Sequence, residues 1–121
     1  MKFLLMIHGA EDAWDALTED EQQAARERYG AFAAAAQERG ALINAGELQS
    51  TASATTVRVK DGTTLVTDGP YAETREVLGG FFLVDAPSLD DAVQLAKQLP
   101  KPHGRGGIEI RPVYETEGAG S

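Results

Sequence analysis

The pattern of apolar positions predicts a sheet of four main strands. The runs that favour strands are short, rich in branched and aromatic residues, and bounded by turn residues. These runs are Lys2–His8, Ala41–Leu48, Leu78–Ala86 and Ile108–Tyr114. Because side chains alternate along a strand, the first run places Phe3 and Leu5 on one face and Leu4 on the other. Both faces of the predicted sheet therefore need cover.

Two further segments carry the signals of helices. Thr18 begins the longer helix, since Thr18 and Glu21 have the spacing of a capping box, and Gly40 is placed to end it. Its apolar stripe, which follows a 3.6-residue period, consists of Ala25, Tyr29, Phe32 and Ala36. The shorter helix begins at Ser88 and ends before Pro100. Its predicted core residues are Val93, Ala96 and Leu99.

A hairpin is predicted between the second and third main strands. Thr55–Lys60 and Thr63–Thr67 are separated by Asp61-Gly62, which suits a type I′ turn because both turn residues must take positive φ. Without the hairpin the order is β-α-β-β-α-β, the ferredoxin-like split βαβ arrangement. We therefore predict an α+β fold in one domain, residues 1–115, followed by a flexible C-terminal tail, residues 116–121.

The helices of such a fold cover one face of the sheet and leave the other bare. An apolar sheet face in water is a large exposed patch, and such patches usually mark interfaces. A stable complex buries roughly 800 Å² per partner. We therefore predict a homodimer in which sheet packs against sheet, an α+β barrel assembled from two chains.

Composition restricts the partners and the compartment. The 121 residues include no cysteine and carry a net charge of −8. Disulfide and thiolate chemistry are therefore excluded, and scattered basic residues in an acidic chain argue against direct nucleic-acid binding. No stretch approaches the ~20 apolar residues of a membrane span, and the N-terminus lacks the features of a signal peptide. We expect a cytoplasmic protein without a membrane partner.

The segment Asp68–Glu76 places three acids and a base between two predicted strands. Its first three residues, Asp68-Gly69-Pro70, suit a turn at a strand end, whereas loops on a rigid scaffold often carry function. The segment is thus either a structural exit from the strand or a ligand-facing loop. The candidate ligand-binding residues are Tyr71, Glu73, Arg75, Glu76 and, from the last strand, Arg111. Arg111 could instead form a structural pair with Glu47.

His8 is the candidate catalytic acid or base. Histidine titrates near neutral pH, and Asp68 is the expected carboxylate that would orient the ring. The alternative is a histidine that is only hydrogen-bonded at the strand end. Two distant histidines give no metal-ligand spacing, so we predict no metal and no cofactor. We interpret Lys101–Gly107 as a linker, because it lacks the spacing of a phosphate-binding loop.

The stretch Asp68-Gly69-Pro70-Tyr71-Ala72-Glu73-Thr74-Arg75-Glu76, followed by Leu78-Gly79-Gly80-Phe81, resembles the DGPF motif of the YCII-related (DGPF-domain) family, with Tyr71 in the place of the phenylalanine. Further similar pieces are Asn44–Leu48, Ala54–Arg58 and Ile108–Val113. The resemblance extends roughly from Lys2 to Tyr114. It implies a dimeric α+β barrel fold.

The same resemblance implies two classes of function. Related YCII proteins carry a histidine–aspartate pair proposed as an acid/base catalyst, and one branch includes a dehydrochlorinase whose histidine lies on the first helix. Here the corresponding residues, Arg28-Tyr29-Gly30-Ala31, contain no histidine. The family also resembles proteins found beside, or fused to, extracytoplasmic-function sigma factors.

Two hypotheses therefore stay open. The first is a small-molecule-binding protein, or a cofactor-independent acid/base enzyme acting on a small organic substrate. The second is a non-catalytic regulatory or protein-interaction module associated with sigma-factor regulation. A binding protein should turn the side chains of Asp68–Glu76 around a concave site, whereas an interaction module should present them on a flat face.

Overall fold

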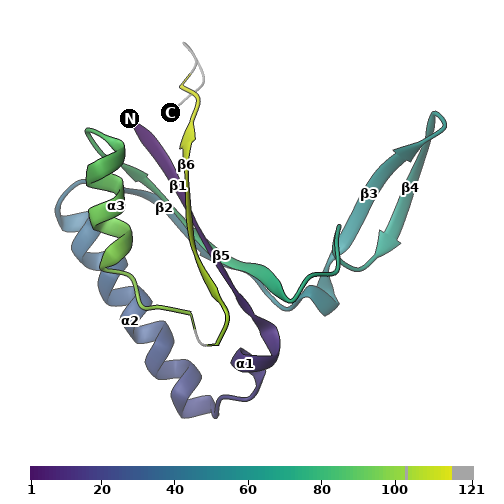
Figure 1. The fold of residues 1–121 in the computed structure, drawn as a ribbon, viewed down its shortest axis with the longest axis horizontal. Coiled ribbons are helices and arrows are strands. Elements are labelled where there is room, and N and C mark those ends of the chain that lie inside the picture. Colours follow the sequence, from purple (N-terminus) through teal and green to yellow (C-terminus); the bar gives the residue numbers. More distant parts are fainter. Residues whose placement is uncertain (103, 116–121) are drawn as a thin grey trace.

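The computed structural model describes residues 1–102 and 104–115, so the predicted tail lies outside the described residues. An antiparallel sheet of order β2-β5-β1-β6 forms its centre (Figure 1). The strands are β1 (Lys2–Ala10), β2 (Leu42–Glu47), β5 (Glu76–Asp85) and β6 (Gly106–Val113). This order confirms the α+β, ferredoxin-like prediction.

Helices α2 (Glu19–Glu38) and α3 (Leu89–Lys97) lie on one side of this sheet (Figure 1). β1 and β2 are both antiparallel to β5, which lies between them, so they run parallel to each other and are joined through α2. This is the split βαβ unit. No helix within the described residues is long and apolar enough to cross a membrane.

The core fills the space between the helices and the sheet. Its sheet residues Phe3, Leu5 and Val84 are fully buried. The capping box of α2 is confirmed, because the Thr18 hydroxyl accepts the Glu21 N–H and the Glu21 carboxylate accepts the Thr18 N–H. The stripe of α2 is confirmed as well: Ala25, Phe32 and Ala36 are buried, and Tyr29 is half-buried.

The predicted core face of α3 is partly wrong. Ala96 and Leu99 are buried as expected, but Val93 is only half-buried. The remaining core positions are Ala92 and Leu95. The four buried residues Ala92, Leu95, Ala96 and Leu99 follow the i, i+3, i+4, i+7 pattern of one helix face. The buried stripe therefore starts at Ala92, one residue earlier than predicted.

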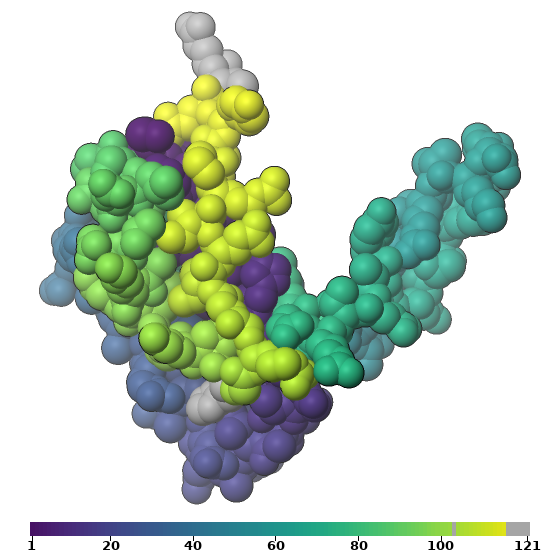
Figure 2. Space-filling model, viewed as in Figure 1, coloured from purple at the N-terminus to yellow at the C-terminus, as the bar shows by residue number. Residues whose placement is uncertain are grey.

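The predicted hairpin is confirmed, and it projects from the main sheet. β3 (Thr55–Lys60) and β4 (Thr63–Asp68) pair with each other in a sheet of their own. Asp61 has a φ of 51° and Gly62 a φ of 76°, as a type I′ turn requires. We call Thr55–Asp68 the arm. Figures 1 and 2 show it projecting on the side of the sheet opposite the helices.

The sheet face away from the helices, here called the open face, carries apolar side chains at its centre. Register and parity place on it Leu4, Met6, Phe81 and Leu83. Each of these is half-buried, whereas the core residues on the other face are buried. The polar side chains His8, Glu109 and Arg111 share this face. The prediction that helices cover only one face of the sheet is therefore confirmed.

Two glycines make a matched test of this packing. A Cβ at Gly80 would lie 2.9 Å from the Gly46 carbonyl oxygen, so Gly80→Ala should push β2 from β5 and lower the free energy of unfolding by about 1–3 kcal/mol. A Cβ at Gly30 in α2 would meet nothing within 4 Å, so Gly30→Ala should raise it by about 1 kcal/mol. Urea unfolding checks both, and equal effects of the two changes would contradict this packing.

Candidate functional site

A group of polar residues lines a depression at the end of β1. It has a volume of about 760 Å³ and lies between the site loop (Asp68–Glu76), α1 (Glu11–Asp15) and the short helix η1 (Thr51–Ser53). Its lining residues are Glu11, Asp12, Asp15, Ser50, Thr51, Ala52, Gly69, Pro70, Ala72, Glu73, Thr74, Arg75, Val77 and Arg105. The site loop thus borders a concave surface.

Glu11 joins α1 to η1. Its carboxylate accepts hydrogen bonds from the Thr51 hydroxyl, from the Thr51 N–H at 3.1 Å and from the Ser50 hydroxyl at 3.1 Å. The Thr51 hydroxyl bond is the main cause that lowers the pKa of Glu11 from 4.5. α1 and η1 are too short for sequence periodicity to reveal, and Glu11 gives them a common anchor.

Arg105 holds the opposite wall of the depression. Its Nε lies 3.2 Å from the Glu76 carboxylate, and its terminal nitrogen lies 3.7 Å from the Asp12 carboxylate. The Ala10 N–H donates to the Arg105 carbonyl at 3.2 Å, which fixes the backbone beside β1. The interpretation of Lys101–Gly107 as a linker is therefore incomplete, because Arg105 in this segment is a wall residue of the site.

The arm is bonded to the site loop. The Thr56 hydroxyl donates to the Gly69 carbonyl at 2.7 Å, and the Arg58 guanidinium donates to the Tyr71 carbonyl at 2.7 Å. The guanidinium also lies over the Tyr71 ring, 5.1 Å from its centroid. Tyr71 itself is 78% exposed. The candidate Tyr71 thus packs on the arm and does not line the depression.

His8 has a carboxylate partner other than the expected one. Its Nε2 lies 3.1 Å from the Glu109 carboxylate, and Glu109 in turn lies 4.0 Å from the Arg111 Nε. Ala10 shares the parity of His8 and directly precedes Glu11, so His8 lies about 7 Å along β1 from the strand end that borders the depression. The expected partner, Asp68, is exposed at the end of β4.

The other candidates divide between the depression and the open face. Glu73 and Arg75 line the depression, and Glu76 supports it through Arg105. Arg111 lies on the open face beside Glu109. The alternative pairing of Arg111 with Glu47 is wrong, because the Glu47 carboxylate bonds the Arg26 guanidinium at 3.1 and 3.2 Å.

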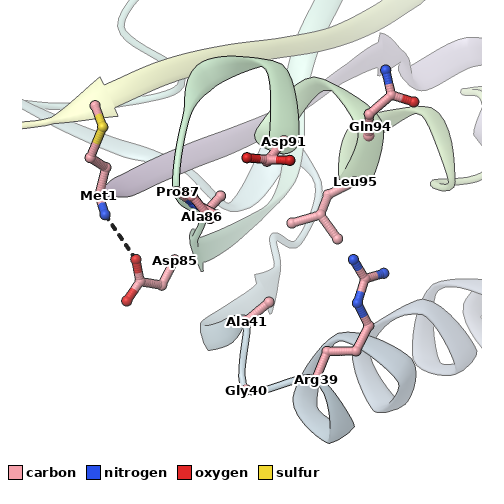
Figure 3. A pocket seen from close by; sticks show the side chains of 10 residues that line it. All are labelled: Met1, Arg39, Gly40, Ala41, Asp85, Ala86, Pro87, Asp91, Gln94 and Leu95. Atoms are coloured by element: carbon pink, nitrogen blue, oxygen red, sulfur yellow. Dashed lines mark hydrogen bonds and ion pairs between the residues drawn. The ribbon is translucent and has the colours of Figure 1, made fainter.

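A second depression lies at the other end of β1 and contains none of the candidates. It has a volume of about 520 Å³ between the ends of α2 and β5 and the start of α3 (Figure 3). The Met1 amino group and the Asp85 carboxylate, 3.0 Å apart, border it. This ion pair ties the start of β1 to the end of β5, which is a structural role.

Two comparisons with known proteins match nearly the whole chain. The family model described as the YCII-related domain matches residues 1–117. An uncharacterised protein of Rhizobium meliloti (strain 1021) is 33% identical over 114 residues, which cover 93% of this chain and 92% of that protein.

The Glu11 anchor predicts a pH effect. Since its pKa is lowered on folding, the stability that Glu11 supplies is present above its ordinary value of 4.5 and is lost as the pH falls through the lower folded value. Glu11→Gln should therefore flatten the fall of unfolding free energy between pH 5 and the acid limit of the folded state, roughly pH 3. Urea titrations at several pH values measure this, with Asp90→Gln on α3 as control. Parallel curves for wild type and Glu11→Gln would contradict the anchor.

Proposed function

Because the chain belongs to the YCII-related family, we propose that it is a homodimer that binds a small polar organic molecule in the depression beside the site loop and performs cofactor-independent acid/base chemistry on it. The observation that carries this proposal is the 760 Å³ concave surface that Glu73 and Arg75 line together with α1, η1 and Arg105. Small-molecule sites are concave and of several hundred Å³.

The charges of the depression favour a ligand with both anionic and donor groups. Asp15, Glu73 and Arg75 have no ion-pair partner within the described part of the chain, whereas Arg105 is matched by two carboxylates. Arg75 would bind a carboxylate or a similar anion. The two free carboxylates would accept hydrogen bonds from an amino group or from hydroxyls. Amino acids and hydroxy acids have this combination of groups.

The proposed acid/base group is His8, oriented by Glu109. Because His8 lies about 7 Å along β1 from the strand end that borders the depression, it would act on the part of a bound ligand that extends from the depression onto the open face. The Glu109 carboxylate, 3.1 Å from Nε2, favours the tautomer in which Nε2 carries the hydrogen, and in that tautomer Nδ1 is the proton acceptor of the ring. Glu109 then takes the orienting role expected of Asp68, and it stabilises the imidazolium that forms. Arg75 would stabilise negative charge that develops on the substrate.

The dimer rests on the open face. Leu4, Met6, Phe81 and Leu83 form an apolar centre that no helix of the described residues covers. A second copy packed on this face would bury these side chains and would also close the site at the end of β1 against water. The site would therefore lie at the rim of the interface, in the cytoplasm expected from the sequence.

A thermal-shift screen of amino acids and hydroxy acids tests ligand binding. A ligand at 100 times its dissociation constant should stabilise the fold by about 2.7 kcal/mol. Arg75→Ala should abolish the shift, while Arg28→Ala, which removes the same charge from α2, should keep it. If no compound shifts the wild type, the interaction-module hypothesis is favoured instead.

For a compound that is turned over, His8→Asn should lower kcat by about 10²–10⁴-fold and change the dissociation constant only a few-fold. Equal kcat in wild type and His8→Asn would contradict the acid/base role. The loss of kcat with intact binding separates this role from a structural one.

A further inference from the structure

The arm carries an apolar surface that no described part of the chain covers. Val57 pairs with Val66, and Val59 lies on the same face of the hairpin, opposite Thr64. These valines are 64%, 65% and 73% exposed, respectively. A two-stranded hairpin alone in water is marginally stable at best, so an arm with a bare valine face is expected to have a partner.

Near the base of the arm, the opposite face of the hairpin contacts the site loop. Thr56 is 9% exposed and bonds Gly69, while Arg58 packs on Tyr71. These contacts fix the base of the arm to the site loop. The valine face is therefore the side that is left for another molecule.

We propose that the valine face of the arm clasps a second copy of this chain. The inference rests on the dimer of the proposed function, and adds to it a contact outside the sheet faces. The arm leaves the body on the side of the open face (Figure 1), the side on which the second copy would dock. By two-fold symmetry each copy would offer its arm to the other, so the contact would occur twice.

Charge favours a second copy as the occupant. The chain has a net charge of −8, so two copies repel each other over most of their surfaces. The arm is an exception, because Arg58 and Lys60 balance Asp61 and Asp68. An electroneutral, apolar arm can meet a second acidic copy without this repulsion.

The arm also links the interface to the ligand site. Its base bonds directly to Gly69 and Tyr71, and Gly69 lines the depression. A clasped arm would therefore hold the site loop in place, so that each site depends on the neighbouring copy for its geometry. The arm becomes a positioning element for the site loop.

Sedimentation equilibrium of the full chain, from nanomolar to micromolar concentration, tests the clasp. The triple variant V57T/V59T/V66T keeps strand-forming residues but removes the apolar face, and should raise the dimer dissociation constant at least about tenfold, or 1.4 kcal/mol. The control Leu65→Thr removes an exposed apolar side chain from the other face, and should change the constant less than threefold.

A second variant with a shortened arm tests the clasp independently, in case the triple variant misfolds. Deleting the facing pairs Val59–Thr64 and Lys60–Thr63 leaves Arg58 opposite Leu65 beside the Asp61-Gly62 turn, so the base of the arm keeps its contacts. This variant should also raise the dissociation constant about tenfold or more. Agreement of the two variants supports the clasp.

The possible failures are distinguishable. If the wild type is a dimer and both arm variants have the same dimer dissociation constant as the wild type, the clasp is wrong and the sheet-to-sheet dimer stands. If Leu65→Thr weakens the dimer as much as the triple variant, the assignment to the valine face is wrong. A wild type that stays monomeric throughout overturns both the clasp and the dimer of the proposed function.

Discussion

The structure depends on an imbalance between the two faces of its sheet. Two helices pack on one face and bury Phe3, Leu5 and Val84, while the opposite face keeps an apolar centre with only half-buried side chains. Burial of apolar area is the main favourable term in folding and in most association. A sheet with one covered and one uncovered apolar face therefore favours association. The arm and the depression at the end of β1 lie beside the uncovered face, so association would affect both of them.

The candidate site follows from where the strands of this sheet end. α1 begins at Glu11, directly after the end of β1. The Glu11 carboxylate accepts the Thr51 N–H and so holds η1 at this strand end. Arg105 arrives beside the same end just before β6 and pairs with Glu76 at the start of β5. The concave surface is thus formed by connections on a rigid sheet, the usual place of binding residues. His8 and Glu109 lie on the sheet itself, where their backbone positions are fixed by strand pairing.

Much of the fold could be predicted from local patterns. Alternation gave both faces of β1, the Thr18 capping box gave the start of α2, and Asp61-Gly62 gave the turn of the arm, because each depends on residues close in sequence. The contacts of the candidate site could not be predicted from such local patterns. Glu109 is bonded to His8 across 101 positions, and Glu11 to Thr51 across 40. Such pairs depend on strand order and register, which single residues do not encode, so Asp68 was expected as the partner of His8.

The central claim is that a second copy covers the open face, and isotope-filtered nuclear Overhauser measurements test it most directly. Protomers labelled with ¹³C in their methionine methyl groups are mixed with unlabelled protomers. The account predicts contacts between the Met6 methyl of a labelled protomer and aromatic or leucine protons of an unlabelled one. Contacts of Met6 within its own protomer only, in a sample with the mass of a dimer or of a single chain, would contradict it.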